Sequence, residues 1–192
     1  LVKSRRYGAC SERNSPSRMV LIELGLCGPR PSHSSSSASK VSVRLLAAGS
    51  LVGNGAASAS LYRGMAYEAQ LVHQSVVDSS GYFSGITDIY TLFEESYGYG
   101  ACVHSDSWGS DTAGAYDGDC RSADLFAWDN PDHLALFASG NAGKDTDANG
   151  IVDLGAVGSP AVAKIVLAVG ATENDRPAGS GGYSSSFWGT KW

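Results

Sequence analysis

Short apolar runs bounded by turn residues recur along the chain after about residue 61. The clearest is Leu134-Ala-Leu-Phe-Ala138, which ends abruptly at Ser139-Gly-Asn-Ala-Gly143. An apolar run of this length that ends in glycine and polar residues is typical of a buried strand. Comparable runs cover residues 69–77, 102–107 and 165–169. The pattern therefore predicts strands in these four places.

Apolar residues at helical spacing lie between these runs. One such segment covers residues 86–97 and is followed by glycines. A second begins at Asp119, a favourable N-cap residue, and ends at Asn130-Pro131. Strands that alternate with helices predict βαβ units, a parallel sheet and right-handed crossovers. The expected fold class is α/β.

Residues 1–46 do not join this pattern. They hold a serine run, several prolines and no sustained period, so we expect an irregular head there. The charge also changes at this point. The head has eight basic and two acidic side chains, whereas residues 47–192 have six basic and 17 acidic ones, and the whole chain carries −5. An acidic body favours a secreted or calcium-binding protein and argues against a nucleic-acid partner.

The apolar runs are all shorter than the ~18 residues that a membrane span needs, so we predict no membrane contact. The run near the N-terminus, residues 19–27, lacks a signal-peptide cleavage pattern. The four cysteines are Cys10, Cys27, Cys102 and Cys120, and their spacing does not fit a metal site. We expect Cys102 and Cys120 to lie close enough for a disulfide.

Four segments in a fixed order carry a family resemblance. They are GNGAASASLYRGMAYEAQLVHQSVVDSS at 53–80, VHSDSWGS at 103–110, LALFASGNAG at 134–143 and GSPAVAKIVLAVGATEN at 158–174. As a set they resemble the catalytic domain of subtilisin-like serine proteases, over roughly Ala48 to Trp192. The resemblance implies a parallel-sheet, three-layer fold that is truncated, with its C-terminal part absent. It also implies a secreted protein that acts on peptide or protein substrates. The expected division is a head at 1–46 and a partial catalytic domain at 47–192.

The resemblance assigns roles to two segments. Asn141 matches the family's oxyanion-hole asparagine, which donates to the developing negative charge in the transition state. Ser107, Trp108 and Gly109 match the strand that pairs with an extended substrate. Ala138, Ser139 and Gly140 match the opposite wall of the substrate pocket. A purely structural interpretation remains for each segment. Asn141 would then lie in an ordinary turn that tolerates Asn, and Trp108 would be a buried residue at the end of a strand.

The catalytic triad of this family is missing from the sequence. The family's Gly-His-Gly-Thr-His segment aligns so that its histidines fall at Val43 and Leu46, neither of which can transfer a proton. No strand ending in Asp-Thr-Gly or Asp-Ser-Gly is recognised in residues 1–46, and no Gly-Thr-Ser-Met-Ala occurs. We expect a partial or degenerate serine endopeptidase whose isolated chain is inactive. We further hypothesise that residues 1–46 are foreign or out-of-frame sequence.

An acidic loop follows the oxyanion turn. Asp145, Asp147 and Asn149 stand at positions 1, 3 and 5 of an EF-hand-type calcium loop, Ile151 at position 7 and Asp153 at position 9. Position 12 is an alanine, so the usual bidentate glutamate is missing. The alternatives are a calcium site and a plain acidic turn.

Two other classes of function stay open on the sequence alone. Residues 45–58 could form a strand followed by a GxGxxS turn, which would suit a nucleotide-binding oxidoreductase. A non-catalytic, calcium-dependent peptide-binding module is the other. His73, His104 and His133 are not spaced as a metal set. His73 and His104 lie within predicted strands, and we expect each of these two to be a structural histidine with its hydrogen bonds satisfied.

Overall fold

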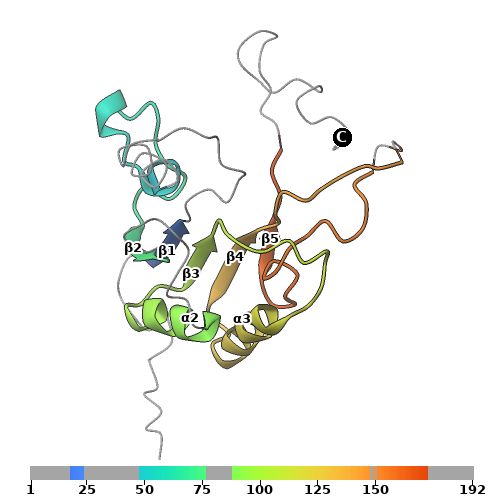
Figure 1. The fold of residues 1–192 in the computed structure, drawn as a ribbon. Coiled ribbons are helices and arrows are strands. Elements are labelled where there is room, and N and C mark those ends of the chain that lie inside the picture. Colours follow the sequence, from blue (N-terminus) through green and yellow to red (C-terminus); the bar gives the residue numbers. More distant parts are fainter. Residues whose placement is uncertain (1–17, 24–47, 77–87, 148, 150, 173–192) are drawn as a thin grey trace, which may run out of the picture.

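The chain forms a five-stranded parallel sheet in the order β2-β1-β3-β4-β5 (Figure 1). The computed structural model describes residues 18–23, 48–76, 88–147, 149 and 151–172. Its strands are β1 (Arg18–Glu23), β2 (Gln70–Ser75), β3 (Val103–Asp106), β4 (Leu134–Ala138) and β5 (Leu167–Val169). Its helices are α2 (Ile89–Gly98), α3 (Gly118–Asp129) and the short 3-10 helix η2 (Ala56–Ser58), and residues 48–52 are also helical. The predicted α/β class with a parallel sheet is confirmed.

The four predicted strands and two predicted helices all form, with shifts at their ends. One N-cap was wrong: α3 is capped by Asp117, whose side chain accepts from the backbone N–H groups of Asp119 and Cys120. Asp119 lies inside the first turn, where a carboxylate still suits the helix dipole. The start of α2 follows the same rule, because Asp88 accepts from the N–H of Tyr90.

Strand β1 corrects the expectation of an irregular head. Residues 18–23 lie at the inside of the sheet, paired in parallel with β2 on one side and β3 on the other. A central strand of a parallel sheet is normally covered on both faces, and its sequence is therefore a continuous apolar run. Residues 19–22, Met-Val-Leu-Ile, form such a run. This part of the head therefore belongs to the sheet. The rest of residues 1–46 lies outside the described residues.

Helices α2 and α3 lie side by side on one face of the sheet (Figure 1). The core between them and the sheet is aromatic: Phe93 of α2 contacts Phe126 of α3 and Phe137 of β4, with ring centroids 5.5 and 6.1 Å apart. His104 and Ala135, paired in register on β3 and β4, are also fully buried on this face. These contacts fix α2 and α3 against strands β3 and β4.

The opposite face of the sheet is partly open, and at β4 and β5 it is apolar. The register puts Leu134, Leu167 and Val169 on this face, and they are 43%, 50% and 45% exposed. Parallel sheets normally have both faces covered. A further layer on this face is what the predicted three-layer fold requires.

Two expectations about the chain are wrong. Cys102 is disulfide-bonded, whereas Cys120 is a buried free thiol, so they do not form the expected bridge. Residues 48–52 are helical, which contradicts the strand that a nucleotide-binding turn at 45–58 would need. Among the described residues, no helix is long and apolar enough to cross a membrane.

Candidate functional site

The order of the strands points to one edge of the sheet as the place where a ligand binds. From β1 the chain moves to β2 on one side, and then to β3, β4 and β5 on the other. Ligands of open parallel sheets bind at the carboxyl ends of the strands where this direction reverses. Here the reversal lies between β1, which ends at Glu23, and β3, which ends at Asp106, so the segment that follows β3 borders this point and the segment that follows β4 comes next to it along the same edge. Because the topology serves many unrelated functions, it gives the place and leaves the chemistry to the residues.

The segment after β3 combines a buried anchor with exposed neighbours. Trp108 is 8% exposed, and its ring packs edge-on against Phe137 with centroids 5.5 Å apart. Its indole Nε1 donates to Oδ1 of Asp106 at 2.8 Å. Ser107 and Gly109 on either side are exposed. The Trp108 side chain is therefore part of the core, and the surface of this segment comes from its neighbours.

Asp106 also holds a buried histidine. Its Oδ2 lies 2.7 Å from Nδ1 of His104, and both side chains are completely buried. The other ring nitrogen of His104 lies 3.3 Å from Oε1 of Gln74 on β2. The prediction that His104 is a satisfied structural histidine is confirmed.

The segment after β4 forms a turn held from both sides. Ser139 donates its backbone N–H to the carbonyl of Val169 at 2.9 Å. Gly140 has φ +108°, a conformation that an L side chain rarely adopts, so the turn needs glycine there. Ala138, Gly140 and Asn141 are exposed. Asn141 is thus an exposed residue of the turn that follows the carboxyl end of β4.

The structure brings the two predicted substrate segments together through residues 158–159. Ser159 and Ser110 form an antiparallel bridge, with N···O distances of 2.8 and 3.0 Å. Gly158 donates its N–H to the carbonyl of Ser139 at 3.0 Å. We call residues 158–159 the crosspiece, because it is hydrogen-bonded to the segment after β3 and to the turn after β4. No pattern in the sequence indicated that these two residues join the two segments.

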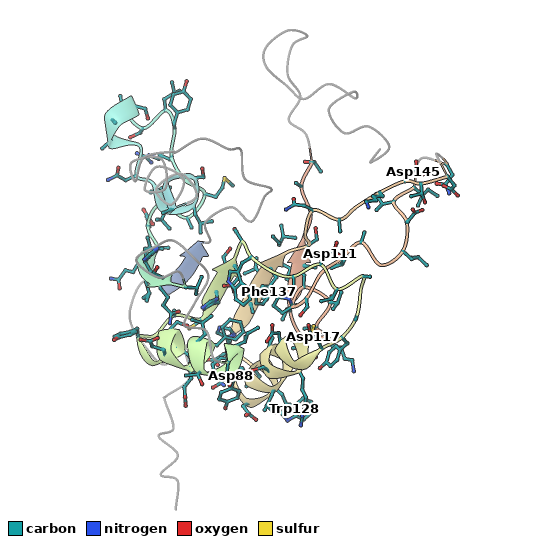
Figure 2. All side chains as sticks on the ribbon, viewed as in Figure 1. Asp88, Asp111, Asp117, Trp128, Phe137 and Asp145 are labelled. Carbon is teal, nitrogen blue, oxygen red and sulfur yellow. The ribbon has the colours of Figure 1, made fainter. Side chains whose placement is uncertain are left out.

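The acidic loop gathers three of the predicted calcium ligands. Asp145, Asp147 and Asp153 each offer an oxygen within 4.8 Å of the others, and Asp145 is buried. Asn149 donates its N–H to Oδ1 of Asp145 at 3.0 Å, and its own Oδ1 accepts from the N–H of Ile151. The three aspartates offer carboxylate oxygens as metal ligands, and oxygen is the ligand type that calcium prefers. In Figure 2, Asp145 lies on a loop that projects beyond the carboxyl ends of the strands.

Two further histidines behave differently from His104. His73 is exposed, whereas His133 is buried and neither of its ring nitrogens has a hydrogen-bond partner among the described residues. Burial lowers the pKa of His133 to about 3, with a smaller contribution in the same direction from His104.

Glu23 is a candidate that the sequence reading missed. It ends β1 and is followed by Leu24 and Gly25, so the strand has the form of the family's Asp-bearing strand, with Glu in place of Asp and Leu in place of Thr or Ser. The register pairs the preceding residue, Ile22, with Asp106 of β3. The signal was the apolar run followed by an acid and a glycine. Val43 and Leu46, by contrast, lie outside the described residues.

Comparison with known proteins identifies the family. A model of the subtilase family matches residues 45–192, and the chain belongs to this family. The predicted resemblance is thereby confirmed. The chain is also similar to the serine protease/ABC transporter B family protein tagA of Dictyostelium discoideum, with 33% identity over 55 residues. That match covers 29% of this chain and 3% of the relative, so the chain spans only a small part of that protein.

Proposed function

We propose that this chain is the peptide-binding part of a subtilisin-like serine endopeptidase. Its site lies at the carboxyl edge of the sheet, between residues 107–110 and residues 138–141. The observation that carries the proposal is the crosspiece, which joins both segments by backbone hydrogen bonds. Two adjacent segments with exposed residues suit an extended peptide, which is recognised by its main chain and by alternate side chains.

Asn141 would supply the oxyanion donor. The exposed position of Asn141 in the turn after β4 supports this role, because the carboxamide must be accessible to hydrogen-bond an oxygen of the substrate. Such a donor stabilises charge that exists only in the transition state. Asn141 should therefore contribute to the reaction rate and very little to the binding of an unreacted peptide.

The reaction itself also needs a nucleophile and a base. The Gly-Thr-Ser-Met-Ala segment does not occur in the 192 residues, and Val43 stands where the family has its catalytic histidine. Glu23 could at most supply the carboxylate that orients such a base. We infer that these 192 residues by themselves bind peptides without cleaving them.

Calcium is part of the same proposal. The oxygen donors of Asp145, Asp147 and Asp153 support a site in the loop that begins shortly after Asn141. Calcium bound there would hold this loop and the adjoining turn. Ala156 at the twelfth position removes the bidentate ligand, so we expect weak affinity, in the range of extracellular modules, about 10⁻⁴–10⁻³ M.

A secreted location accompanies this function. The disulfide at Cys102 supports it, because disulfides persist in oxidising compartments. The acidic body of the chain is in keeping with that location.

The proposal can be tested by calorimetric titration of the chain with a blocked extended hexapeptide. Ala138→Glu places a charged side chain at an exposed position of the site and should weaken binding at least tenfold. Ala57→Glu makes the same change at an exposed position in η2 and should leave the affinity unchanged. Equal affinities for both variants, or no binding by the unaltered chain, would contradict the proposed site.

A further inference from the structure

The crosspiece is packed too closely against the segment after β3 to move independently of it. A Cβ atom added to Gly109 would lie 2.6 Å from the carbonyl oxygen of Ser159. A Cβ added to Gly158 would lie 2.4 Å from the carbonyl oxygen of Ser110. Both distances are far below an ordinary contact, so the two backbones touch directly. A displacement of Ser159 would therefore displace residues 109–110.

The crosspiece is held by hydrogen bonds to residues at the start of α3. The Ser159 hydroxyl is buried, donates to Oδ1 of Asp117 at 2.6 Å and accepts from the Cys120 thiol at 3.4 Å. Asp117 is also the N-cap of α3, where it accepts from the N–H groups of Asp119 and Cys120, both at 3.1 Å. One carboxylate oxygen thus ties the start of a helix to the crosspiece. Figure 2 shows Asp117 beside α3, well away from Asp145 of the acidic loop.

The Asp117 carboxylate is suited to this task because it stays charged. Burial by itself would raise the pKa of Asp117, but the hydrogen bonds from Ser159, Cys120 and Asp119 outweigh that effect and lower it below its ordinary value. Hydrogen bonds to an ionised acceptor are roughly twice as strong as neutral ones. The link from α3 to Ser159 is therefore a firm one.

We propose that Asp117 is a positioning residue which, through the Ser159 hydroxyl, sets the spacing between residues 107–110 and residues 138–140 and so determines which peptide side chains fit between them. Asp117 and Ser159 themselves do not touch the peptide. The statement about side-chain selection rests on the proposed function, whereas the mechanical link between α3 and the two segments does not.

Hydrogen exchange tests the mechanical link without any peptide. Ser159→Ala removes only the hydroxyl, and we expect the amide protons of Ser110 and Gly158 to exchange at least tenfold faster, while that of Phe137 in β4 is unchanged. Ser122→Ala is the matched control, because it removes another α3-linked hydroxyl, bonded to Asp88 and Tyr90. Asp117→Asn keeps one acceptor oxygen and should give an intermediate increase. Wild-type exchange at Ser110 and Gly158 in Ser159→Ala would overturn the link.

Peptide selectivity tests the rest of the proposal. Two blocked hexapeptides that differ only by Ala or Phe at one central position are titrated into each variant. Ser159→Ala should change the ratio of their Kd values at least threefold, and Ser122→Ala should not. Faster exchange with an unchanged ratio would overturn the role in selection. If the unaltered chain binds neither peptide, the proposed function and the role in selection fail together, and the exchange result still decides the link.

Discussion

His104 and Asp106 stand two residues apart on β3 and form a completely buried pair, with Nδ1 of the imidazole 2.7 Å from Oδ2 of the carboxylate. The second oxygen of Asp106 accepts from Trp108. The Asp106 carboxylate thus satisfies two buried nitrogen atoms, Nδ1 of His104 and Nε1 of Trp108, next to the segment that begins at Ser107. A His–Asp pair invites comparison with catalytic dyads, but complete burial keeps this one away from substrate. Its role is to hold the segment that begins at Ser107.

Asp106→Ala should therefore destabilise the fold strongly. It leaves Nδ1 of His104 and Nε1 of Trp108 buried without an acceptor, and breaking a buried pair in this way costs about 3–5 kcal/mol. Asp106→Asn keeps an acceptor oxygen and should cost less. Urea unfolding measures both. Asp111→Ala, at an exposed aspartate, serves as control and should unfold at the wild-type urea concentration. An Asp106→Ala midpoint equal to that of the control would contradict the role assigned to the pair.

His133 should make the fold sensitive to acid. The groups facing it are His104 on β3, with ring centroids 6.1 Å apart, the neighbouring Asp132, and Tyr97 of α2, whose hydroxyl donates to Asp132. Because the folded-state pKa of His133 is about 3 and the ordinary value is 6.5, the unfolded chain binds the extra proton between these pH values. Stability should fall as the pH drops from about 6.5 to about 3, by up to about 1.4 kcal/mol per pH unit.

His133→Phe removes this titration and should flatten the acid side of the stability profile. The change replaces a buried polar ring whose nitrogens lack described partners with an apolar one, so stability at neutral pH should not suffer greatly. His73→Gln, at an exposed position, controls for the loss of an imidazole. Thermal unfolding between pH 3 and pH 7 decides the matter. An acid slope in His133→Phe as steep as in the unaltered chain would refute the assignment.

Calcium should raise the thermal midpoint of the chain. A ligand that binds only the folded state stabilises it by about 2.7 kcal/mol at 100 times its Kd. Asp147→Ala removes one of the three clustered carboxylates and should abolish the increase. Asp111→Ala removes an exposed carboxylate elsewhere and should retain it. A calcium response that persists in Asp147→Ala would show that the ion binds somewhere else.

The isolated chain should not cleave peptides by a Ser-His-Asp mechanism. Subtilisin variants without triad members keep a residual rate of about 10³–10⁴ over water, which depends on an otherwise complete enzyme. Hydrolysis of a chromogenic peptide, with and without a serine-directed covalent inhibitor, measures this. Stoichiometric labelling of any serine, together with loss of activity, would mean that another residue has become the nucleophile.

The sequence predicted strands β2, β3, β4 and β5 and helices α2 and α3 because each has a local signal. Strands such as Leu134–Ala138 are apolar runs with sharp ends, and the two helices show apolar residues at helical spacing or a polar start and a proline at the end. Strand β1 was missed because its apolar run stands among arginines, prolines and serines, and because its partners lie far along the chain: Met19 pairs with Leu71 and Val103. Such long-range pairing leaves no local trace in the sequence.

The candidate site was predicted in its parts and not in its assembly. The motifs located the segments around Trp108 and Asn141, but no pattern indicated that Ser159 joins them or that Asp117 holds Ser159. For β3 the sequence predicted that His104 is a structural histidine with satisfied hydrogen bonds, but it did not identify the partners of that histidine. His104 is tolerated inside because Asp106 and Gln74 satisfy it, and that pairing depends on the three-dimensional arrangement.

The central claim is that an extended peptide binds between residues 107–110 and residues 138–141. The most direct measurement is a titration of isotopically labelled chain with a blocked extended hexapeptide, followed through the backbone amide resonances. We predict saturable shifts concentrated at Ser107, Gly109, Gly140 and Asn141, with the amides of α2 unaffected. Asn141→Ala should leave the affinity within about twofold, because an oxyanion donor acts in the transition state. Shifts confined to another surface, or no shifts at millimolar peptide, would contradict the claim.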